Sequence, residues 1–573
     1  MSDMTIFTTL QEDIIAICIE AFGDKQLDYS RLVVELPRDE SHGDLSTNAA
    51  MVLAKQIGMP PRELAQKIAD QLAKRDEIDK VEIAGPGFIN LGLATGVWAS
   101  QLEAVLAAGA NFGRIDVLKP DTVNVEFVSA NPTGPLHAAH ARGAIFGDVL
   151  ANLLNFTGQT VTREYYINDA GAQVDVLARS AYLRYLQALG KDDITIAEGL
   201  YPGEYLVDVG HALKDKFGDR LEDAPESEWL DEVRSFTIAA MMEGIKADLE
   251  GLGIKMDLFS SEHALVSDGK VDEAISALTD QGLVYRGVLE PPKGQLPDDW
   301  EPREQLLFKA TQFGDDVDRP LQKSDGSWTY FASDVAYHKD KYTRTRGKLI
   351  NVWGADHGGY VKRMKSATHA ISGQEDILDV KLCQLVSLLD NGKPVKMSKR
   401  AGTFVTLSDV MAAVGPDVMR FIMLTRRNDQ KLEFDYAKVT EKSKENPVFY
   451  VQYAHARACS VLRQNPDMGA ELSAGGRLDD INEIRLIKHL VSWPSLVHSA
   501  AKLHEPHRIC FYLIELAGLF HSLWTAGREN PELRFIVDND PALTAARLAL
   551  VSSVAQTLKI GLEILSVTAL EEM

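Results

Sequence analysis

The sequence contains little cysteine and shows no cysteine pairing pattern. Its 573 residues include four cysteines, and no two of them are spaced as C-x-x-C. Cysteines this few and this scattered predict neither a disulfide framework nor a cysteine-built zinc site. We therefore expect no protein-bound metal and a reducing, cytoplasmic location. The four are Cys18, Cys383, Cys459 and Cys510.

Long apolar runs are missing as well. No uncharged stretch approaches the roughly 20 residues that span a bilayer. The first residues carry Asp3, Glu12 and Asp13 and lack the basic flank and apolar core of a signal peptide. We therefore expect no membrane partner. The content of 45% hydrophobic and 25% charged residues is typical of a globular protein, and the length allows three or four domains.

Two common nucleotide-binding motifs are absent, although the pattern of a nucleotide fold is present. The sequence has no G-x-x-x-x-G-K-[ST] and no G-x-G-x-x-G after a first strand, which disfavours P-loop nucleotidases and nicotinamide enzymes. Strand and helix patterns nevertheless alternate at 123–128, 138–156, 160–167 and 170–189, and a strand returns at 348–353. This alternation predicts an α/β fold, a Rossmann-type doubly wound parallel sheet.

An excess of positive charge is also lacking, since the formal net charge is -23. Nucleic-acid binders usually present basic surface, so this total disfavours one. The acid is concentrated, however, because residues 191–305 hold 27 acidic and 11 basic side chains, whereas residues 440–573 hold 16 and 13. Residues 339–365 carry eight Lys and Arg against two Asp and form a locally basic patch beside the predicted strands.

These patterns predict three domains. Residues 1–116 mix helix and strand patterns, with strands at 32–36, 81–84 and 88–91 and a helix at 62–74, and form a small α/β unit. Residues 117–440 hold the parallel sheet, interrupted by an acidic inserted segment at about 191–325. Residues 441–573 have helical periodicity throughout and predict an all-α bundle.

The stretch VNVEFVSANPTGPLHAAHARGAIFG, residues 123–147, predicts a strand, a turn and a helix. His137 and His140 are expected in the first turn of that helix, on one face. Unpaired N–H groups at a helix N-terminus hold phosphate, and two imidazoles there can donate hydrogen bonds as charge develops on it. A helix cap or a metal site would use the same residues, although no further ligand is near in sequence.

A second stretch, KPVKMSKRAGTFVT at residues 393–406, places Lys396, Lys399 and Arg400 beside Ser398 and Gly402. Such a basic loop can grip a polyanion during reaction, although a solvated basic turn would have the same composition. At the end of the strand at 348–353, Gly354, Asp356 and His357 are placed to meet a ribose or simply to form a turn.

Together, HAAH and KMSK resemble the two signatures of class I aminoacyl-tRNA synthetases. EFVSANPTGPLHAAHARGA, TYFASDVAYHKDKY, VWGADHGGY and NPVFYVQYAHAR resemble the arginyl-tRNA synthetase family, and the resemblance spans nearly the whole chain. Ala139 stands where the family's first signature has glycine. The resemblance implies activation of arginine by ATP, with Mg²⁺ supplied by the nucleotide, and transfer from arginyl-adenylate to the 2′-hydroxyl of the terminal adenosine of tRNA(Arg).

The resemblance also implies roles for single residues. The catalytic residues would be His137, His140, Lys396 and Lys399. The ATP site would comprise Gly134, His137, His140, Gly354, Asp356, His357, Met397, Ser398 and Lys399. The arginine site would comprise Asn131, Glu262, Tyr330 and Asp334, because a guanidinium calls for carboxylates that accept paired hydrogen bonds.

The resemblance gives roles to the outer domains too. The N-terminal unit would contact the outer corner of the tRNA, although a solubilising appendage has the same pattern. The bundle would bind the anticodon stem and loop, with stacking or core positions at Tyr450, Tyr453, His455 and Arg457. We expect a monomer. Two alternatives stay open: a class I synthetase for another amino acid such as lysine, and a catalytically silent tRNA-binding paralogue.

Overall fold

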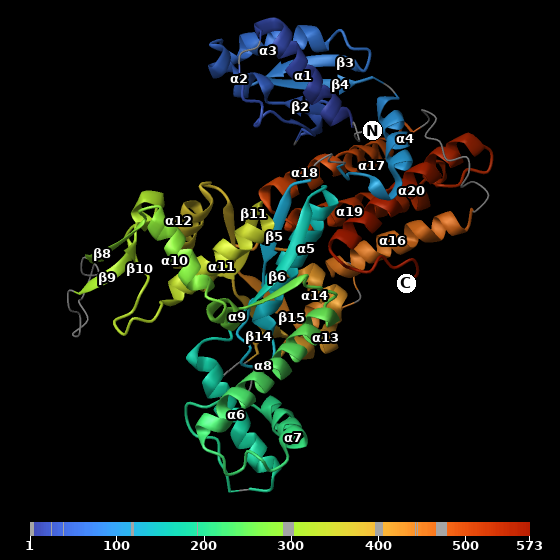
Figure 1. Cartoon of the computed structure of the whole chain (residues 1–573). Coiled ribbons are helices and arrows are strands. Elements are labelled where there is room, and N and C mark those ends of the chain that lie inside the picture. The colour runs from blue at the N-terminus through green and yellow to red at the C-terminus, as the bar shows by residue number, and fades with distance from the viewer. Residues whose placement is uncertain are drawn as a thin grey trace. The chain divides into compact units, whose positions relative to one another are not determined.

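The computed structural model describes residues 5–23, 26–37, 39–94, 96–115, 120–191, 193–289, 303–395, 405–441, 443, 445–465 and 478–573. The chain forms two compact units (Figure 1). One comprises Met1–Val117, Phe156–Gly158 and Lys442–Met573, and the other comprises Leu118–Asn155 and Gln159–Glu441. The second unit carries every predicted catalytic, ATP-binding and arginine-binding position.

A sheet of five parallel strands forms the centre of the second unit. The strands are β5 (Thr122–Glu126), β6 (Thr160–Ile167), β7 (Leu258–Ser261), β11 (Lys348–Gly354) and β12 (Leu378–Cys383). They lie in the order β12-β11-β5-β6-β7, so the direction of winding reverses between β5 and β11. Sheets of this kind bind ligands outside the carboxyl ends of the strands at that reversal. The predicted doubly wound parallel sheet is confirmed.

Helices join these strands. They are α5 (Ala138–Phe156), α6 (Ala172–Ala188), α11 (Tyr330–Thr345) and α12 (Val361–Ser372). The bounds of α5 and β6 coincide with the predicted 138–156 and 160–167. In α5, Ala141, Ile145 and Val149 recur at helical spacing and are all fully buried, and this apolar stripe is the local reason why the segment is a helix.

A helical segment with a core of its own follows β6. Helix α6 packs against α7 (Tyr205–Phe217) and α8 (Glu226–Gly251) (Figure 1). Their core includes Tyr182 and Trp229, whose stacked rings are 3.8 Å apart between centroids. We call residues 172–251 the inserted helical segment. The chain then returns to the main sheet as β7, so the acidic range 191–325 contains one strand of that sheet.

The second unit has several smaller elements. Helix α9 (Glu262–Ser267) follows β7, and α10 (Lys270–Asp280) packs on α11. An antiparallel sheet comprises β8 (Val284–Val288), β9 (Glu304–Phe308) and β10 (Arg319–Pro320). A third sheet comprises β13 (Val386–Asp390), β14 (Lys393–Pro394) and β15 (Leu432–Asp435). The remaining helices are α13 (Leu407–Val414), α14 (Pro416–Met423) and α15 (Tyr436–Val439).

The basic patch predicted at residues 339–365 is partly internal. The Lys341 ammonium is fully buried and lies 2.6 Å from a Glu126 carboxylate oxygen and 2.7 Å from the Asn351 side-chain oxygen. Arg344 forms ion pairs with Glu164 and Asp340. The surface charge of this stretch is therefore smaller than its residue count suggests, and the prediction is corrected accordingly.

The first unit contains an α/β part near the N-terminus. Its antiparallel sheet has the order β1-β2-β4-β3 and comprises β1 (Val34–Glu35), β2 (Leu45–Thr47), β3 (Ile78–Ala84) and β4 (Phe88–Leu93). The helices are α1 (Ile6–Phe22), α2 (Ala49–Ile57), α3 (Pro61–Leu72) and α4 (Val97–Ala108). The strand expected at 32–36 is shorter than predicted, because β1 is an edge strand followed by Pro37.

The same unit contains the C-terminal helices. They are α16 (Pro447–Arg463), α17 (Ile481–Val491), α18 (Trp493–Leu503), α19 (His507–Glu529) and α20 (Pro541–Ile564), which pack as a bundle. Among the described residues, α19 alone is long and apolar enough to cross a membrane by length and composition. Its Leu513, Leu516 and Phe520 are fully buried against the other helices, as in the core helix of a bundle.

Candidate active site

A pocket of about 730 Å³ opens at the carboxyl ends of β5 and β11, where the winding of the sheet reverses. Four groups of residues line it: the turn and helix after β5, the end of β11 with the loop after it, the end of β12 with the two residues that follow, and residues of the inserted helical segment. Of the predicted site residues, the pocket gathers Asn131, Gly134, His137, His140, Gly354, Asp356 and His357. A pocket of this volume is large enough for a small-molecule ligand.

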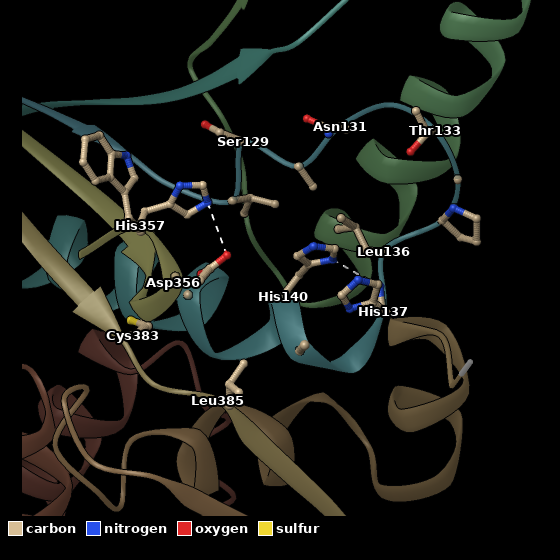
Figure 2. A pocket seen from close by; sticks show the side chains of 18 of the residues that line it. Ser129, Asn131, Thr133, Leu136, His137, His140, Asp356, His357, Cys383 and Leu385 are labelled. Atoms are coloured by element: carbon tan, nitrogen blue, oxygen red, sulfur yellow. Dashed lines mark hydrogen bonds and ion pairs between the residues drawn. The ribbon is translucent and has the colours of Figure 1, made fainter. Parts of the chain in front are cut away.

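The two histidines of the first signature lie face to face (Figure 2). The ring centroids are 3.7 Å apart, and His140 Nδ1 accepts a hydrogen bond of 3.3 Å from the His137 backbone N–H. Helix α5 begins at Ala138, so His140 lies in its first turn, whereas His137 directly precedes the helix. The prediction that both lie in the first turn is therefore wrong for His137, although the rings do share one side.

The loop after β11 forms another wall of the pocket. Asp356 and His357 are both mainly exposed, with 3.6 Å between an Asp356 carboxylate oxygen and His357 Nε2 (Figure 2). A Cβ at Gly354 would overlap the Asp356 carboxylate in this position, so a larger residue there would turn the carboxylate away. The pair therefore presents an acceptor and an imidazole that hydroxyl groups of a ligand can reach.

The positions Lys396, Met397, Ser398 and Lys399 of the second signature lie outside the described residues. The chain on either side of them is described. Before the second signature, Leu385 lines the pocket and leads into β13 and β14. Beyond it, the Val405 carbonyl accepts a hydrogen bond from the Ala138 backbone N–H, and the Leu407 backbone N–H donates to the Leu136 carbonyl. The described chain that follows the second signature is thus held beside the first signature.

The residues predicted to hold arginine lie around the carboxyl ends of β6 and β7. Glu262 directly follows β7 and is largely buried. Helix α11 packs against α9 and begins with Tyr330, whose exposed hydroxyl is 3.9 Å from the position a Cβ on Gly171 would take. Asp334, one turn along α11, accepts a 2.5 Å hydrogen bond from the Tyr360 hydroxyl. None of the three predicted residues lines the pocket at β5 and β11.

Burial and neighbouring carboxylates raise the pKa values of two acids in this region. Burial raises the pKa of Asp334 to about 7, and the charges of Glu262 and Glu126 add to this effect, while the hydrogen bond from Tyr360 opposes it. Burial also raises the pKa of Glu262, with a contribution from Asp169. A cluster of buried acids with raised pKa values is a site that a cation would stabilise.

Asn131 differs in position from the other three predicted arginine-binding residues. It lines the pocket, and its side-chain N–H donates a 3.0 Å hydrogen bond to the Gln173 side-chain oxygen at the start of α6. The backbone just before it is unusual, because Val128 and Ser129 have φ values of 68° and 40°. Non-glycine residues with positive φ are strained and persist only where their surroundings hold them. Ser129 is held by a hydrogen bond of 3.2 Å to Glu126.

Sequence patterns did not reveal several residues that shape the site. Arg142, two positions after His140, is almost fully buried and donates to the backbone carbonyls of Gln384, Arg426, Arg427 and Gln430. It ties α5 to the residue that follows β12 and to the segment between α14 and β15. Tyr201 and Tyr205 line the pocket from the inserted helical segment. Both lie far in sequence from either signature, so no sequence pattern indicated that they line the pocket.

The candidate stacking residues of the C-terminal bundle divide into core and surface. His455 is buried, and its Nδ1 is 2.8 Å from the Leu570 carbonyl oxygen, so it belongs to the core. Arg457 lies over the rings of Tyr453 and Trp524, at 4.4 and 4.7 Å from their centroids. Tyr453 is 36% exposed, so this group retains an aromatic face at the surface.

Three consecutive regions, which together cover most of the chain, match family models. Residues 8–93 match the arginyl tRNA synthetase N terminal domain, residues 101–443 match the catalytic domain of the class I (R) tRNA synthetases, and residues 451–573 match the DALR anticodon binding domain. The chain belongs to the arginyl-tRNA synthetase family. Within that family, the five-stranded sheet with its two signatures is the class I catalytic domain.

Similar proteins agree with this assignment. The chain is 57% identical to an arginine–tRNA ligase of Ruegeria pomeroyi, with 100% of each chain covered, and 56% identical to one of Azorhizobium caulinodans, with 98% of each covered. The solved structure of an arginyl-tRNA synthetase from Thermus thermophilus has a TM-score of 0.74 at 23% identity and covers 99% of this chain and 100% of its own. That likeness concerns the fold.

The enzyme is therefore a class I arginine–tRNA ligase, which attaches arginine to tRNA in an ATP-dependent reaction. ATP with Mg²⁺, arginine and tRNA are its substrates. The predicted family, fold and activity are confirmed. The two alternatives, a silent paralogue and a synthetase for another amino acid such as lysine, find no support in these relatives.

Proposed function

We propose that the pocket at β5 and β11 binds ATP and that the carboxylate cluster at β6 and β7 binds the arginine side chain. The hydrogen bonds that hold residues 405–407 beside residues 136–138 carry this proposal, because they bring the chain around KMSK to the first signature. Asn131, which lines the pocket and donates to Gln173, orients the amino acid.

The first step then follows from charge and position. An oxygen of the arginine carboxylate attacks the α-phosphorus of ATP, the bond from that phosphorus to the bridging oxygen breaks, and pyrophosphate leaves with Mg²⁺. His137 and His140 stabilise the charge that develops on the phosphoryl oxygens. Lys396 and Lys399 meet the departing pyrophosphate, with Met397 and Ser398 against the nucleotide. Gly134 and Gly354 allow the backbone to approach ATP, and Asp356 and His357 hold its ribose.

The second step is transfer to tRNA. The 2′-hydroxyl of the terminal adenosine attacks the arginyl carbonyl, and AMP leaves. We infer that residues 1–116 contact the outer corner of tRNA(Arg) and that residues 441–573 bind its anticodon stem and loop. The aromatic face formed by Tyr453, Arg457 and Trp524 supports the second contact, since bases stack on such surfaces. The enzyme acts as a monomer in the cytoplasm.

Ala139 provides a steric test of the ATP site. It lines the pocket between the two histidines, so Ala139→Leu adds bulk where the nucleotide is expected. Overpacking of this kind raises the KM for ATP roughly tenfold or more, while the KM for arginine stays constant. Ala139→Gly, which restores the family's glycine, is the matched control and leaves the KM for ATP equal or lower. Equal ATP kinetics in all three proteins would move ATP out of this pocket.

Lys399→Ala tests the second signature. Pyrophosphate leaves only in the first step, so the variant slows adenylate formation at least roughly tenfold more than transfer from preformed adenylate. Single-turnover assays with arginyl-adenylate supplied or formed in place separate the two rates. If both steps slow by the same factor, Lys399 has a general structural role instead.

A further inference from the structure

Tyr205 is one of the residues through which the inserted helical segment reaches the proposed ATP pocket. Tyr205 is the first residue of α7, and its hydroxyl donates a 2.7 Å hydrogen bond to the Thr133 carbonyl in the turn between β5 and α5. The aromatic ring lies against Gly134, where a Cβ would be 3.1 Å from the ring carbon that carries the hydroxyl. The segment therefore contacts the turn through both a polar and an apolar interaction.

Glycines lie on both sides of the Tyr205 ring. A Cβ at Gly203 would overlap the ring directly, whereas a Cβ at Gly134 would make a tight contact with it. The ring thus lies between two glycines, of which Gly203 leaves no room for a side chain and Gly134 leaves little. Burial raises the pKa of the Tyr205 hydroxyl well above its usual range, so the group remains a protonated donor at neutral pH.

The inserted helical segment fixes the position of Tyr205. Leu206 is fully buried in the core of that segment, and Tyr205 itself packs against the same core. Two hydrogen bonds fix the chain just before it: Arg184 donates to the Pro202 carbonyl at 2.8 Å, and the Tyr201 backbone N–H donates to the Ser180 hydroxyl at 3.0 Å. Tyr205 is therefore presented by a rigid support and not by a free loop.

The turn that Tyr205 contacts leads directly to the first signature. Only Pro135 and Leu136 separate Gly134 from His137, and the Thr133 backbone N–H donates to the Asn131 carbonyl at 2.8 Å. Asn131 and His137 both face the pocket (Figure 2). A displacement of Thr133 is thus passed to residues on both sides of it.

We propose that Tyr205 is a positioning residue for adenylate formation, through which the inserted helical segment fixes the turn that presents Asn131 and His137. This inference rests on the proposed function, since it assumes that His137 acts on ATP. It assigns a role in the first step to a segment that carries neither signature. Tyr205 touches the turn and is not itself required to contact the reacting atoms.

Tyr205→Phe is the direct test, because it keeps the ring and removes the donor. We expect kcat for arginine-dependent pyrophosphate exchange, measured with tRNA(Arg) present, to fall about 3- to 10-fold, the scale of one neutral hydrogen bond. The KM for arginine and the melting temperature stay close to those of the unchanged protein. Tyr185→Phe is the matched control, since that hydroxyl donates to the Gly218 carbonyl inside the same segment at 2.8 Å but does not line the pocket. It lowers the melting temperature and leaves kcat unchanged.

A double substitution tests the contact with Gly134. Gly134→Ala slows exchange because its methyl group presses on the ring, whereas in a Tyr205→Ala background the same change has little further effect. Independent, multiplicative losses would overturn the contact. An unchanged kcat in Tyr205→Phe, or an equal loss in Tyr185→Phe, would overturn the positioning role.

His137→Ala, measured alongside, separates failure of this inference from failure of the proposed function. If His137→Ala abolishes most exchange while Tyr205→Phe is normal, only the role of Tyr205 is overturned. If His137→Ala is itself normal, the catalytic assignment on which the inference rests is overturned.

Discussion

Replacing His137 or His140 by alanine lowers kcat for adenylate formation roughly 10²-fold or more, the loss that follows removal of one oxyanion-type donor. The two rings lie face to face at the start of α5 and line the pocket, so both face the charge that develops on the phosphoryl oxygens. ATP binding changes less than kcat, because the interaction strengthens in the transition state. Pyrophosphate exchange at varied ATP concentrations measures both quantities.

The double variant and a distant histidine sharpen this test. Because the rings are stacked, His137→Ala with His140→Ala together costs less than the product of the single losses. His369 lies on α12, packs edge-on against Phe313 and does not line the pocket, so His369→Ala serves as the control and leaves kcat unchanged. An unaltered kcat in either signature variant would exclude that histidine from the transition state.

Helices and strands whose formation depends on neighbouring residues could be predicted from the sequence. The apolar stripe of α5 and the alternation of strand and helix patterns gave the correct bounds of α5 and β6, because both patterns lie within the elements themselves. In contrast, β7 has only four residues, all of them partly buried, in an acidic stretch. Only pairing with β6 makes it a strand of the main sheet, and no local pattern reports that pairing.

For the same reason, the number of charged residues in a stretch did not predict whether their side chains lie at the surface. Lys341 is one of eight cations in a short stretch, yet it is buried against Glu126 on β5. Its partner lies 215 residues away in sequence. A buried ammonium needs such a partner, and the partner becomes visible only in the folded chain. Tyr205 is a similar case, since its role depends on a turn that the sequence places 72 residues earlier.

Residues of the candidate site that lie in a family signature could be proposed from the sequence. Residues that packing alone brings to the site could not. Asn131, His137, Asp356 and His357 line one pocket, and the roles that the resemblance gives them stay predictions. The family motifs also pointed to Asp334 and Glu262 as arginine-binding residues. Without those motifs, a single acidic residue in so acidic a chain would not indicate a binding site. Tyr360, the hydroxyl partner of Asp334, was not foreseen, because its contact depends on the packing of α11 beside the loop after β11.

Arginine binding is expected to depend on pH through Asp334. Burial raises the pKa of this carboxyl to about 7 in the arginine-free protein, and a guanidinium pairs with the ionised form. Below pH 7 the proton must leave before arginine binds, so the KM for arginine rises as the pH falls. The free energy of unfolding of the arginine-free protein changes with pH in the opposite direction. The stabilising contribution of the protonated Asp334 carboxyl is complete below the ordinary pKa of 3.8 and is lost as the pH rises through about 7. Bound arginine then restores it.

Asp334→Asn removes this charge while preserving shape. The variant should raise the KM for arginine roughly 10- to 100-fold, the scale of a hydrogen bond to a charged group, and leave the KM for ATP nearly constant. The pH dependence of the KM below 7 should also disappear, which a merely structural defect would not cause. Because citrulline carries no charge, its disadvantage relative to arginine should narrow in the variant. Exchange assays with both amino acids from about pH 5.5 to 8.5, a range that extends about one and a half units to either side of the raised pKa of about 7, measure all of these effects. If arginine kinetics and their pH profile are the same in Asp334→Asn and the unchanged enzyme, Asp334 does not bind the guanidinium, and the predicted role of the carboxylate falls to Glu262 alone.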